Sequence, residues 1–309
     1  MGEAPLPRAA GAAGGRVERL PAEASPPLAP PASGRGTIRQ AIAAAARRFG
    51  SSATPRLDAE LLMAHALGVT REALLLGRLD DPAPPGFAAL AERRTAAEPV
   101  AYITGVRAFW TIELAVDPRV LIPRADSETL IEAAVDHFAG TPGPRTVLDL
   151  GTGSGALLLA ALDQWPAATG IGIDRSADAV QVARANARRL GFGSRARIEW
   201  GDWSEGSLPR GDFDLVLCNP PYIPSRADLP REVAGYEPSA ALYAGLDGHD
   251  DLLQVAGVVR GLLAPGGVAC IEIGHDQGAW ATALFRAAGL GVNLRQDLGG
   301  RDRCVMVTP

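Results

Sequence analysis

The tetrapeptide from Asn219 to Tyr222, Asn-Pro-Pro-Tyr, carries residue types suited to holding a planar NH2 group. Such a group is a poor nucleophile because its lone pair is delocalised, so methylating it requires oriented hydrogen-bond acceptors and a flat surface. The Asn219 side-chain oxygen and the Pro220 carbonyl can each accept one N–H, while Pro220 and Pro221 stiffen the turn. The Tyr222 ring can lie against an amide or a base. The tetrapeptide therefore predicts N-methylation of an amide or amino group.

A glycine-rich turn upstream could hold the methyl donor. It consists of Gly151, Thr152, Gly153, Ser154 and Gly155, after a strand-like run and before a helical one. The glycines have no side chains to keep an adenosyl cofactor away from the backbone. Their spacing is not G-x-G-x-x-G, so the dinucleotide fingerprint is absent, and S-adenosylmethionine is favoured over NAD.

Three residues beyond the turn complete the predicted cofactor site. Asp174 ends the second strand about 20 residues later, where a carboxylate can accept hydrogen bonds from ribose hydroxyls. Asp202 could hold the adenine amino group, and Trp203 could pack on the ring. A solvated strand end is the alternative for Asp174, and a core side chain is the alternative for Trp203. No metal site is predicted, because the methyl group of a sulfonium is already activated.

The chain has 309 residues and a formal net charge of −5. This length allows one large domain and a smaller one. The negative charge argues against coating of nucleic acid, which needs a cationic surface. No apolar run reaches the roughly 20 residues of a membrane span, and the N-terminus lacks a secretory signal, so we expect a cytoplasmic enzyme without membrane contact. The three cysteines, Cys218, Cys270 and Cys304, are expected to be buried thiols.

The N-terminal third divides into an extension and a helical domain. Residues 1–36 are rich in Ala, Pro and Gly without periodicity, which predicts disorder. Residues 37–98 predict a small helical domain, whose first helix opens with a capping box of Thr37 and Gln40.

A second helix is expected to begin at Thr54, with Pro55 at its first helical position. Its apolar face is expected to comprise Leu57, Leu61, Leu62 and His65. His65 is interpreted as a core histidine rather than a ligand. Further helices are expected near residues 70–78 and 86–97.

Residues 99–123 predict a β-hairpin linker between two domains. Its strands are expected at 108–116 and 120–122, with Asp117-Pro118 as the turn between them.

Residues 124–309 predict the catalytic domain. A helix is expected to begin at Ser127, and strands then alternate with helices, which implies a mostly parallel sheet covered on both faces. The expected strands lie at 146–150, 169–173, 196–200, 213–218 and 268–273. Two more, at 292–297 and 304–308, flank Gly299-Gly300 as an antiparallel closing hairpin. The expected fold is α/β, with a doubly wound sheet of seven strands and a small N-terminal helical domain.

Several motifs in the same order resemble the release factor glutamine methyltransferases of the PrmC/HemK family, which are S-adenosylmethionine-dependent enzymes with a seven-stranded sheet. The resemblance runs from about residue 37 to the end. Beyond the glycine turn and Asn-Pro-Pro-Tyr, the motifs are Glu98 to Gly105, Phe109-Trp110, Leu121 to Arg124 with Asp126-Ser127-Glu128, Tyr236-Glu237-Pro238, and Asp297 to Arg301. Two departures are Ala125, where the family usually has proline, and residues 1–36, which have no recognised counterpart.

The resemblance implies methyl transfer to the side-chain amide nitrogen of the glutamine in the Gly-Gly-Gln loop of peptide chain release factors. It implies that the glycine turn, Asp174 and Trp203 hold the cofactor. It further implies that Asn219 to Tyr222 hold the glutamine and that the helical domain helps to dock the release factor.

Three other functions stay open. A glutamine methyltransferase acting on a ribosomal protein would share these motifs. A DNA adenine N6-methyltransferase uses the same kind of turn, but it must also flip the base and grip phosphates, and no basic recognition domain is evident here. A non-catalytic cofactor-binding protein would have no use for acceptors that orient an amide.

Overall fold

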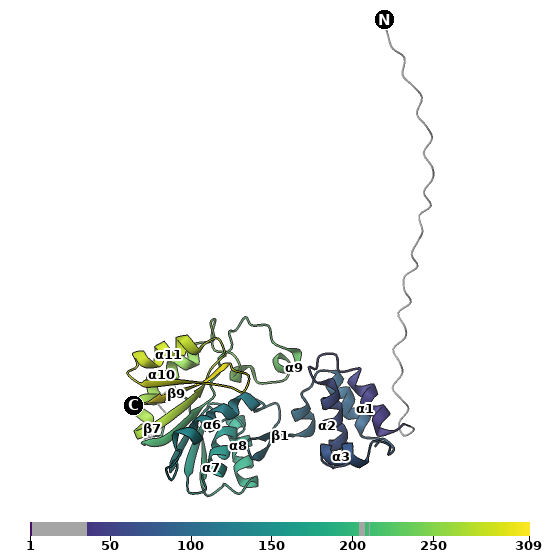
Figure 1. Cartoon of the computed structure of the whole chain (residues 1–309), viewed down its shortest axis with the longest axis horizontal. Helices are drawn as coiled ribbons and strands as arrows, with labels where there is room; N and C mark the ends of the chain where they lie inside the picture. The colour runs from purple at the N-terminus through teal and green to yellow at the C-terminus, as the bar shows by residue number, and fades with distance from the viewer. Residues whose placement is uncertain (2–35, 204–207, 210) are drawn as a thin grey trace.

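The computed structural model describes residues 1, 36–203, 208–209 and 211–309. It contains a small helical unit, a two-stranded ribbon and a large α/β unit, in that order along the chain (Figure 1). The extension predicted at residues 1–36 lies outside the described residues, apart from its two ends.

The helical unit contains α1 (Ile38–Ala46), α2 (Pro55–Leu67), α3 (Arg71–Gly77), α4 (Phe87–Thr95) and the short α5 (Val100–Thr104). The capping box of Thr37 and Gln40 is confirmed. These helices enclose a separate apolar core, which includes Ile38, Ile42, Leu62, Met63, Leu74 and Phe87. The unit has its own core because each helix buries one apolar face against the others.

The prediction for the buried face of α2 was wrong. Leu57, Leu61 and His65 are exposed, and of the four expected residues only Leu62 is buried. The buried face instead includes Asp58 and Glu60. Both carboxylates are paired with arginines, Asp58 with Arg94 and Glu60 with Arg56 and Arg71. Ion pairing allows carboxylates to be buried, which hydrophobic periodicity alone does not reveal.

The predicted hairpin exists, but its turn was misplaced. Strands β1 (Val106–Phe109) and β2 (Ile112–Ala115) pair antiparallel around Trp110 and Thr111, and residues 120–122 form no strand. Trp110 adopts a positive φ of 54°, a conformation usually associated with glycine. Its backbone N–H donates to the Glu128 carboxylate and its indole N–H to Gln164, and these bonds hold the turn.

The large unit is built on a seven-stranded sheet, which confirms the predicted fold class. The strand order is β5-β4-β3-β6-β7-β9-β8, and among the described strands β9 alone runs opposite to the others. The strands are β3 (Thr146–Leu150), β4 (Thr169–Asp174), β5 (Ala196–Trp200), β6 (Phe213–Cys218), β7 (Leu263–Glu272), β8 (Gly291–Gln296) and β9 (Asp302–Thr308). The order reverses direction between β3 and β6, which is where such sheets bind ligands.

Helices cover both faces of this sheet (Figure 1). On one face lie α6 (Glu128–His137), α7 (Ala156–Gln164) and α8 (Ala177–Arg189), and on the other lie α10 (Asp250–Val258) and α11 (Gly278–Ala287). Side chains alternate between the two cores: Val147 packs in the first, and Leu148 and Leu150 pack in the second. This alternation follows from the two-residue period of a β-strand.

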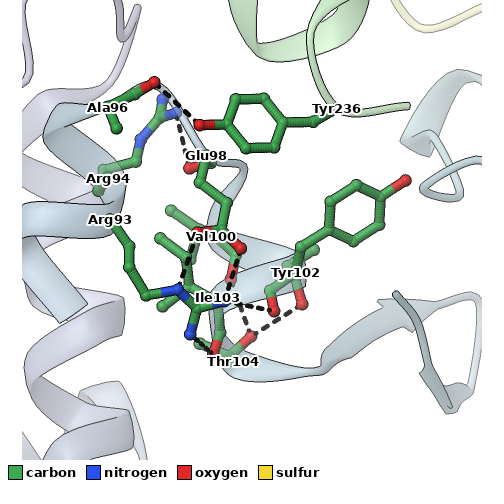
Figure 2. Close-up of polar contacts among 10 residues, drawn as sticks. Arg93, Arg94, Ala96, Glu98, Val100, Tyr102, Ile103, Thr104 and Tyr236 are labelled. Carbon is green, nitrogen blue, oxygen red and sulfur yellow. Dashed lines mark hydrogen bonds and ion pairs between the residues drawn. The ribbon is translucent and has the colours of Figure 1, made fainter. Parts of the chain in front are cut away.

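The segment between β6 and β7 contacts the helical unit. Short helix α9 (Arg231–Ala234) carries Glu232, which pairs with the buried Arg94 of α4 at 2.6 Å. Figure 2 shows the Tyr236 hydroxyl pointing at the Ala96 carbonyl, to which it donates at 3.0 Å. It also shows Arg93 paired with Glu98 and reaching toward the carbonyls of α5. The two units are therefore joined by polar contacts as well as by the ribbon.

The three cysteines are buried and unpaired, as the sequence predicts. Among the described helices, none has the length and apolar character that crossing a lipid bilayer requires.

Candidate active site

A cavity of about 430 Å³ opens at the carboxyl ends of β3, β4 and β6. Sites for small molecules in α/β sheets occupy this position. Nine of the residues predicted from sequence line it: Gly151, Thr152, Gly153, Ser154, Asp174, Asp202, Trp203, Asn219 and Pro221. The cavity brings these nine residues together from distant parts of the chain, because parallel strands end at one edge of the sheet.

Three other predicted residues lie outside the cavity lining: Gly155, Pro220 and Tyr222. Gly155 is the N-cap of α7, with a φ of 87°, and an added Cβ there would approach Leu159 to 3.1 Å. Pro220 is buried, and Tyr222 is half-buried with its hydroxyl directed at Glu272.

The glycine turn leaves open space where a cofactor could approach. Gly151 and Gly153 have φ values of 73° and 56°, which side chains rarely adopt. A Cβ on Gly151 would come 3.3 Å from the Trp203 ring, whereas one on Gly153 would meet nothing within 4 Å. The N–H groups of Gly151 and Thr152 both donate to the Ile173 carbonyl, which ties the turn to the end of β4.

Asp174 links the turn to the next helix. Its two carboxylate oxygens accept the N–H groups of Gly153 and Ser176, each at 2.8 Å. Desolvation raises the pKa of Asp174, and these two hydrogen bonds oppose the rise. Each carboxylate oxygen keeps a second lone pair, so the group can still accept hydrogen bonds from the hydroxyls of a ribose.

Trp203 forms one wall of the cavity. Its ring is buried against the glycine turn, and its indole N–H is buried without a hydrogen-bond partner among the described residues. A buried donor without a partner is costly, so a polar group of a bound ligand could satisfy it. Asp202 lines the cavity beside it. An aromatic wall, an adjacent carboxylate and the open glycine turn together suit an adenosyl group.

Asp149 lies beneath the turn and is completely buried. Its Oδ2 accepts the Thr152 hydroxyl at 2.6 Å and the Leu158 N–H at 3.2 Å, whereas its Oδ1 has no partner in the described chain. Desolvation raises the pKa of Asp149 to about 7. The carboxyl thus braces the turn from below.

The Asn-Pro-Pro-Tyr turn follows β6 directly, and β6 pairs in parallel with β3, which leads into the glycine turn. A Cβ on Gly151 would come within 4.0 Å of the Asn219 carbonyl oxygen. The Asn219 Nδ2 donates to the Ser127 hydroxyl at 3.2 Å, and the Tyr222 hydroxyl donates to Glu272 Oε1 at 3.1 Å. The two turns are therefore immediate neighbours at the mouth of the cavity.

The sequence-based site missed lining residues that precede α6. Phe109, Arg119, Val120, Pro123 and Ser127 all line the cavity. Phe109, Pro123 and Ser127 lie in motifs that carry the family resemblance, but such a motif does not say which side chains face a ligand. Arg119 and Val120 lie in none of these motifs.

Within the described residues, no cluster of three or more His, Cys, Asp or Glu side chains is placed to hold a metal ion.

Comparisons with known proteins identify the family. Residues 40–105 match the PrmC N-terminal domain, and residues 144–279 match a methyltransferase domain. A release factor glutamine methyltransferase of Rhodospirillum rubrum is 44% identical over 258 residues, which cover 82% of this chain and 78% of the relative. The chain belongs to the release factor glutamine methyltransferases.

Other members of the family are similarly close. The release factor glutamine methyltransferase of Caulobacter vibrioides is 41% identical, with coverage of 82% of this chain and 89% of the relative. Among solved structures, the release factor-specific protein-(glutamine-N5) methyltransferase of Alicyclobacillus acidocaldarius is 27% identical over 63% of this chain and 98% of that chain, with a TM-score of 0.38. The methyl donor is S-adenosylmethionine, as predicted.

Proposed function

We propose that this protein methylates the side-chain amide nitrogen of the glutamine in the Gly-Gly-Gln motif of peptide chain release factors, using S-adenosylmethionine. The names of its relatives at 41–44% identity support this substrate. The observation that carries the proposal is the position of Asn219, which lines the cavity beside the glycine turn while its Nδ2 is engaged by Ser127. Its Oδ1 is left to accept a substrate N–H.

The proposed cofactor residues are Gly151 to Gly155, Asp174, Asp202, Trp203 and Asn219. When bound, S-adenosylmethionine supplies an activated methyl group on a sulfonium. The chain's task is to place the glutamine nitrogen in line with that methyl group and to exclude water. Positioning of this kind can supply on the order of 7 to 11 kcal/mol.

The proposed substrate residues are Asn219, Pro220, Pro221 and Tyr222. The Asn219 Oδ1 and the Pro220 carbonyl would each accept one amide N–H and so direct the nitrogen lone pair toward the methyl group. The same acceptors would stabilise positive charge developing on the nitrogen. Gly155, Pro220 and Tyr222 lie outside the cavity lining. Gly155 and Tyr222 would therefore act by shaping the two turns, whereas Pro220 would contribute its backbone carbonyl.

The domain boundaries follow from the same proposal. Residues 37–98, together with α5, would form the docking domain for the release factor, the rest of residues 99–123 the linker, and residues 124–309 the methyltransferase domain. Since release factors act on ribosomes, we propose a cytoplasmic location.

A transfer assay tests the substrate. The protein is incubated with labelled S-adenosylmethionine and, in separate reactions, purified release factors, ribosomal proteins or DNA duplexes, and mass spectrometry locates the methyl group. We expect N5-methylglutamine in the Gly-Gly-Gln motif of a release factor. Methylation of a ribosomal protein or of DNA alone would replace the proposed substrate, and cofactor binding without any transfer would favour a non-catalytic role.

Asn219→Ala tests the proposed site. Because the variant lacks the side-chain acceptor but keeps the backbone of the turn, we expect turnover to be abolished while cofactor affinity stays within a few-fold. Single-turnover rates and equilibrium binding of the cofactor measure the two effects separately. Turnover equal to that of the parent protein would refute the assignment of Asn219.

A further inference from the structure

Two residues that contact the Asn-Pro-Pro-Tyr turn, Ser127 and Glu272, have not yet been given a role of their own. Ser127 precedes α6 and is 3% exposed, and Glu272 ends β7 and is 1% exposed. Each makes a direct hydrogen bond to a side chain of the turn, Ser127 to Asn219 and Glu272 to Tyr222. Glu272 reaches the turn because Cys218 on β6 pairs with Ile271 on β7, which places Asn219 and Glu272 at adjacent strand ends.

The Ser127 hydroxyl does not cap its own helix, α6. Serine at the N-cap usually accepts an N–H from the first turn of the helix. Ser127 is the N-cap of α6, but its side chain makes no capping bond. The hydroxyl instead accepts the Asn219 Nδ2 donor at 3.2 Å. A capping role therefore does not account for this serine.

The bond to Ser127 determines which end of the Asn219 amide faces the cavity. An amide has a donor end and an acceptor end, and a half-turn exchanges them. With Nδ2 engaged by Ser127, Oδ1 is left free, because no hydrogen bond to it occurs among the described residues. The reversed amide would present its own N–H groups to the N–H groups of a substrate amide.

Glu272 fixes the other end of the turn. Its Oε1 accepts the Tyr222 hydroxyl at 3.1 Å, and the Ser127 hydroxyl faces the same carboxyl. Desolvation raises the pKa of Glu272, and hydrogen bonding by Ser127 and Tyr222 together with the charge of Arg303 opposes that rise. Arg303 on β9 also pairs with Asp126, the neighbour of Ser127, at 3.3 Å. Ser127 and Glu272 therefore belong to one set of contacting side chains, which Arg303 links to the segment before α6.

We propose that Ser127 and Glu272 are positioning residues for the turn: Ser127 sets the orientation of the Asn219 amide so that Oδ1 faces the substrate, and Glu272 holds the Tyr222 ring through its hydroxyl. This inference rests on the proposed function, because it explains why the Asn219 Oδ1 faces the cavity, where the substrate amide requires an acceptor.

Ser127→Ala and Ser127→Thr test the first half. The alanine variant allows the amide to rotate, so we expect kcat to fall about 5- to 10-fold, the effect of one lost hydrogen bond. Cofactor Kd should stay within twofold. Ser127→Thr keeps the hydroxyl and should restore most of kcat. Thr70→Ala is the matched control, because Thr70 does cap its helix, α3, far from the cavity. It should lower Tm without changing kcat.

Tyr222→Phe and Glu272→Leu test the second half. Tyr222→Phe keeps the ring and removes only the hydroxyl, so it carries the test if the Glu272 variant does not fold. We expect each single variant to raise the KM for the release factor several-fold, and the double variant to lose little more than the worse single variant, because both break the same bond. A parental kcat in Ser127→Ala would overturn the role of Ser127. A parental KM in Tyr222→Phe, or additive losses in the double variant, would overturn that of Glu272.

The Asn219→Ala variant separates failure of this inference from failure of the proposed function. If Asn219→Ala is inactive while Ser127→Ala and Tyr222→Phe behave like the parent protein, the turn is catalytic but is not positioned by these two residues. If Asn219→Ala is fully active, the assignment of Asn219 and this inference both fail, whereas the proposed function fails only if the transfer assay finds no methylated release factor.

Discussion

At the scale of single residues, the left-handed backbone of Gly153 determines how closely a cofactor can approach the turn. Gly153→Ala would add a Cβ facing open space in the cavity, and Gly191→Ala would add one facing open space remote from it. Both glycines have positive φ, 56° and 80°, so each variant should lose about 1 to 2 kcal/mol of stability. Only Gly153→Ala should also weaken cofactor binding, which calorimetry and denaturation would measure. Equal cofactor affinities in the two variants would contradict the proposal that the glycine turn holds the cofactor.

The buried Asp149 carboxyl predicts a pH dependence of stability. Its pKa is about 7 in the folded protein against an ordinary value of 3.8. Between these values the folded state retains a proton that the unfolded state has released, so the free energy of unfolding falls as pH rises across this window. Asp149→Asn cannot titrate and should remove this part of the decline. Chemical denaturation of both proteins from pH 4 to 8 measures the difference, and parallel curves would contradict the assignment.

Residue chemistry predicted part of the site and not the rest. Asn219 and Gly151 to Ser154 were predicted and line the cavity, because amide acceptors and small residues have few other reasons to occur at these positions. Ser127 was not found as a site residue because serine before a helix already has an ordinary explanation as an N-cap. Glu272 was not found because nothing in the sequence distinguishes a buried acid at a strand end from a solvated one.

At the scale of elements, sequence patterns located most helices and strands. They failed where tertiary contacts determine the position of a turn or the buried face of a helix. The turn of the ribbon lies at Trp110, whose positive φ is stabilised by bonds to Glu128 and Gln164, residues distant in sequence. The Asp117-Pro118 pair gave a stronger local signal but does not lie in the hairpin turn. The prediction of the buried face of α2 was wrong for a related reason, since the burial of Asp58 depends on its ion pair with Arg94, 36 positions away.

At the scale of elements, substitution of Arg94 tests the contact between the helical unit and α9. Its side chain is 4% exposed and pairs with Asp58 on α2 and with Glu232 on α9. Arg94→Ala leaves the buried Asp58 carboxylate without its cation, so we expect a loss of about 3 to 5 kcal/mol of stability. Arg39→Ala, which breaks the exposed pair with Asp80, should cost at most about 1 kcal/mol. Urea denaturation followed by tryptophan fluorescence and circular dichroism compares them, and equal midpoints would show that the buried pair contributes little.

At the scale of the whole molecule, the topology explains why distant motifs meet. Alternating strands and helices predicted a parallel sheet, and short right-handed connections allow few strand orders. The reversal of that order between β3 and β6 puts the glycine turn beside Asn-Pro-Pro-Tyr. The packing of α9 and Tyr236 against the helical unit was not predictable, because it depends on single polar contacts between units far apart in the chain.

The most direct test is a crystal structure of the protein with S-adenosylhomocysteine and a glutamine-containing Gly-Gly-Gln peptide. We expect the Asn219 Oδ1 and the Pro220 carbonyl to accept the two amide hydrogens at about 3 Å. The glutamine nitrogen should then point at the cofactor sulfur, along the line the methyl group would follow. A complex in which the Asn-Pro-Pro-Tyr turn faces away from the sulfur, or in which the glutamine amide is held by other residues, would contradict the account.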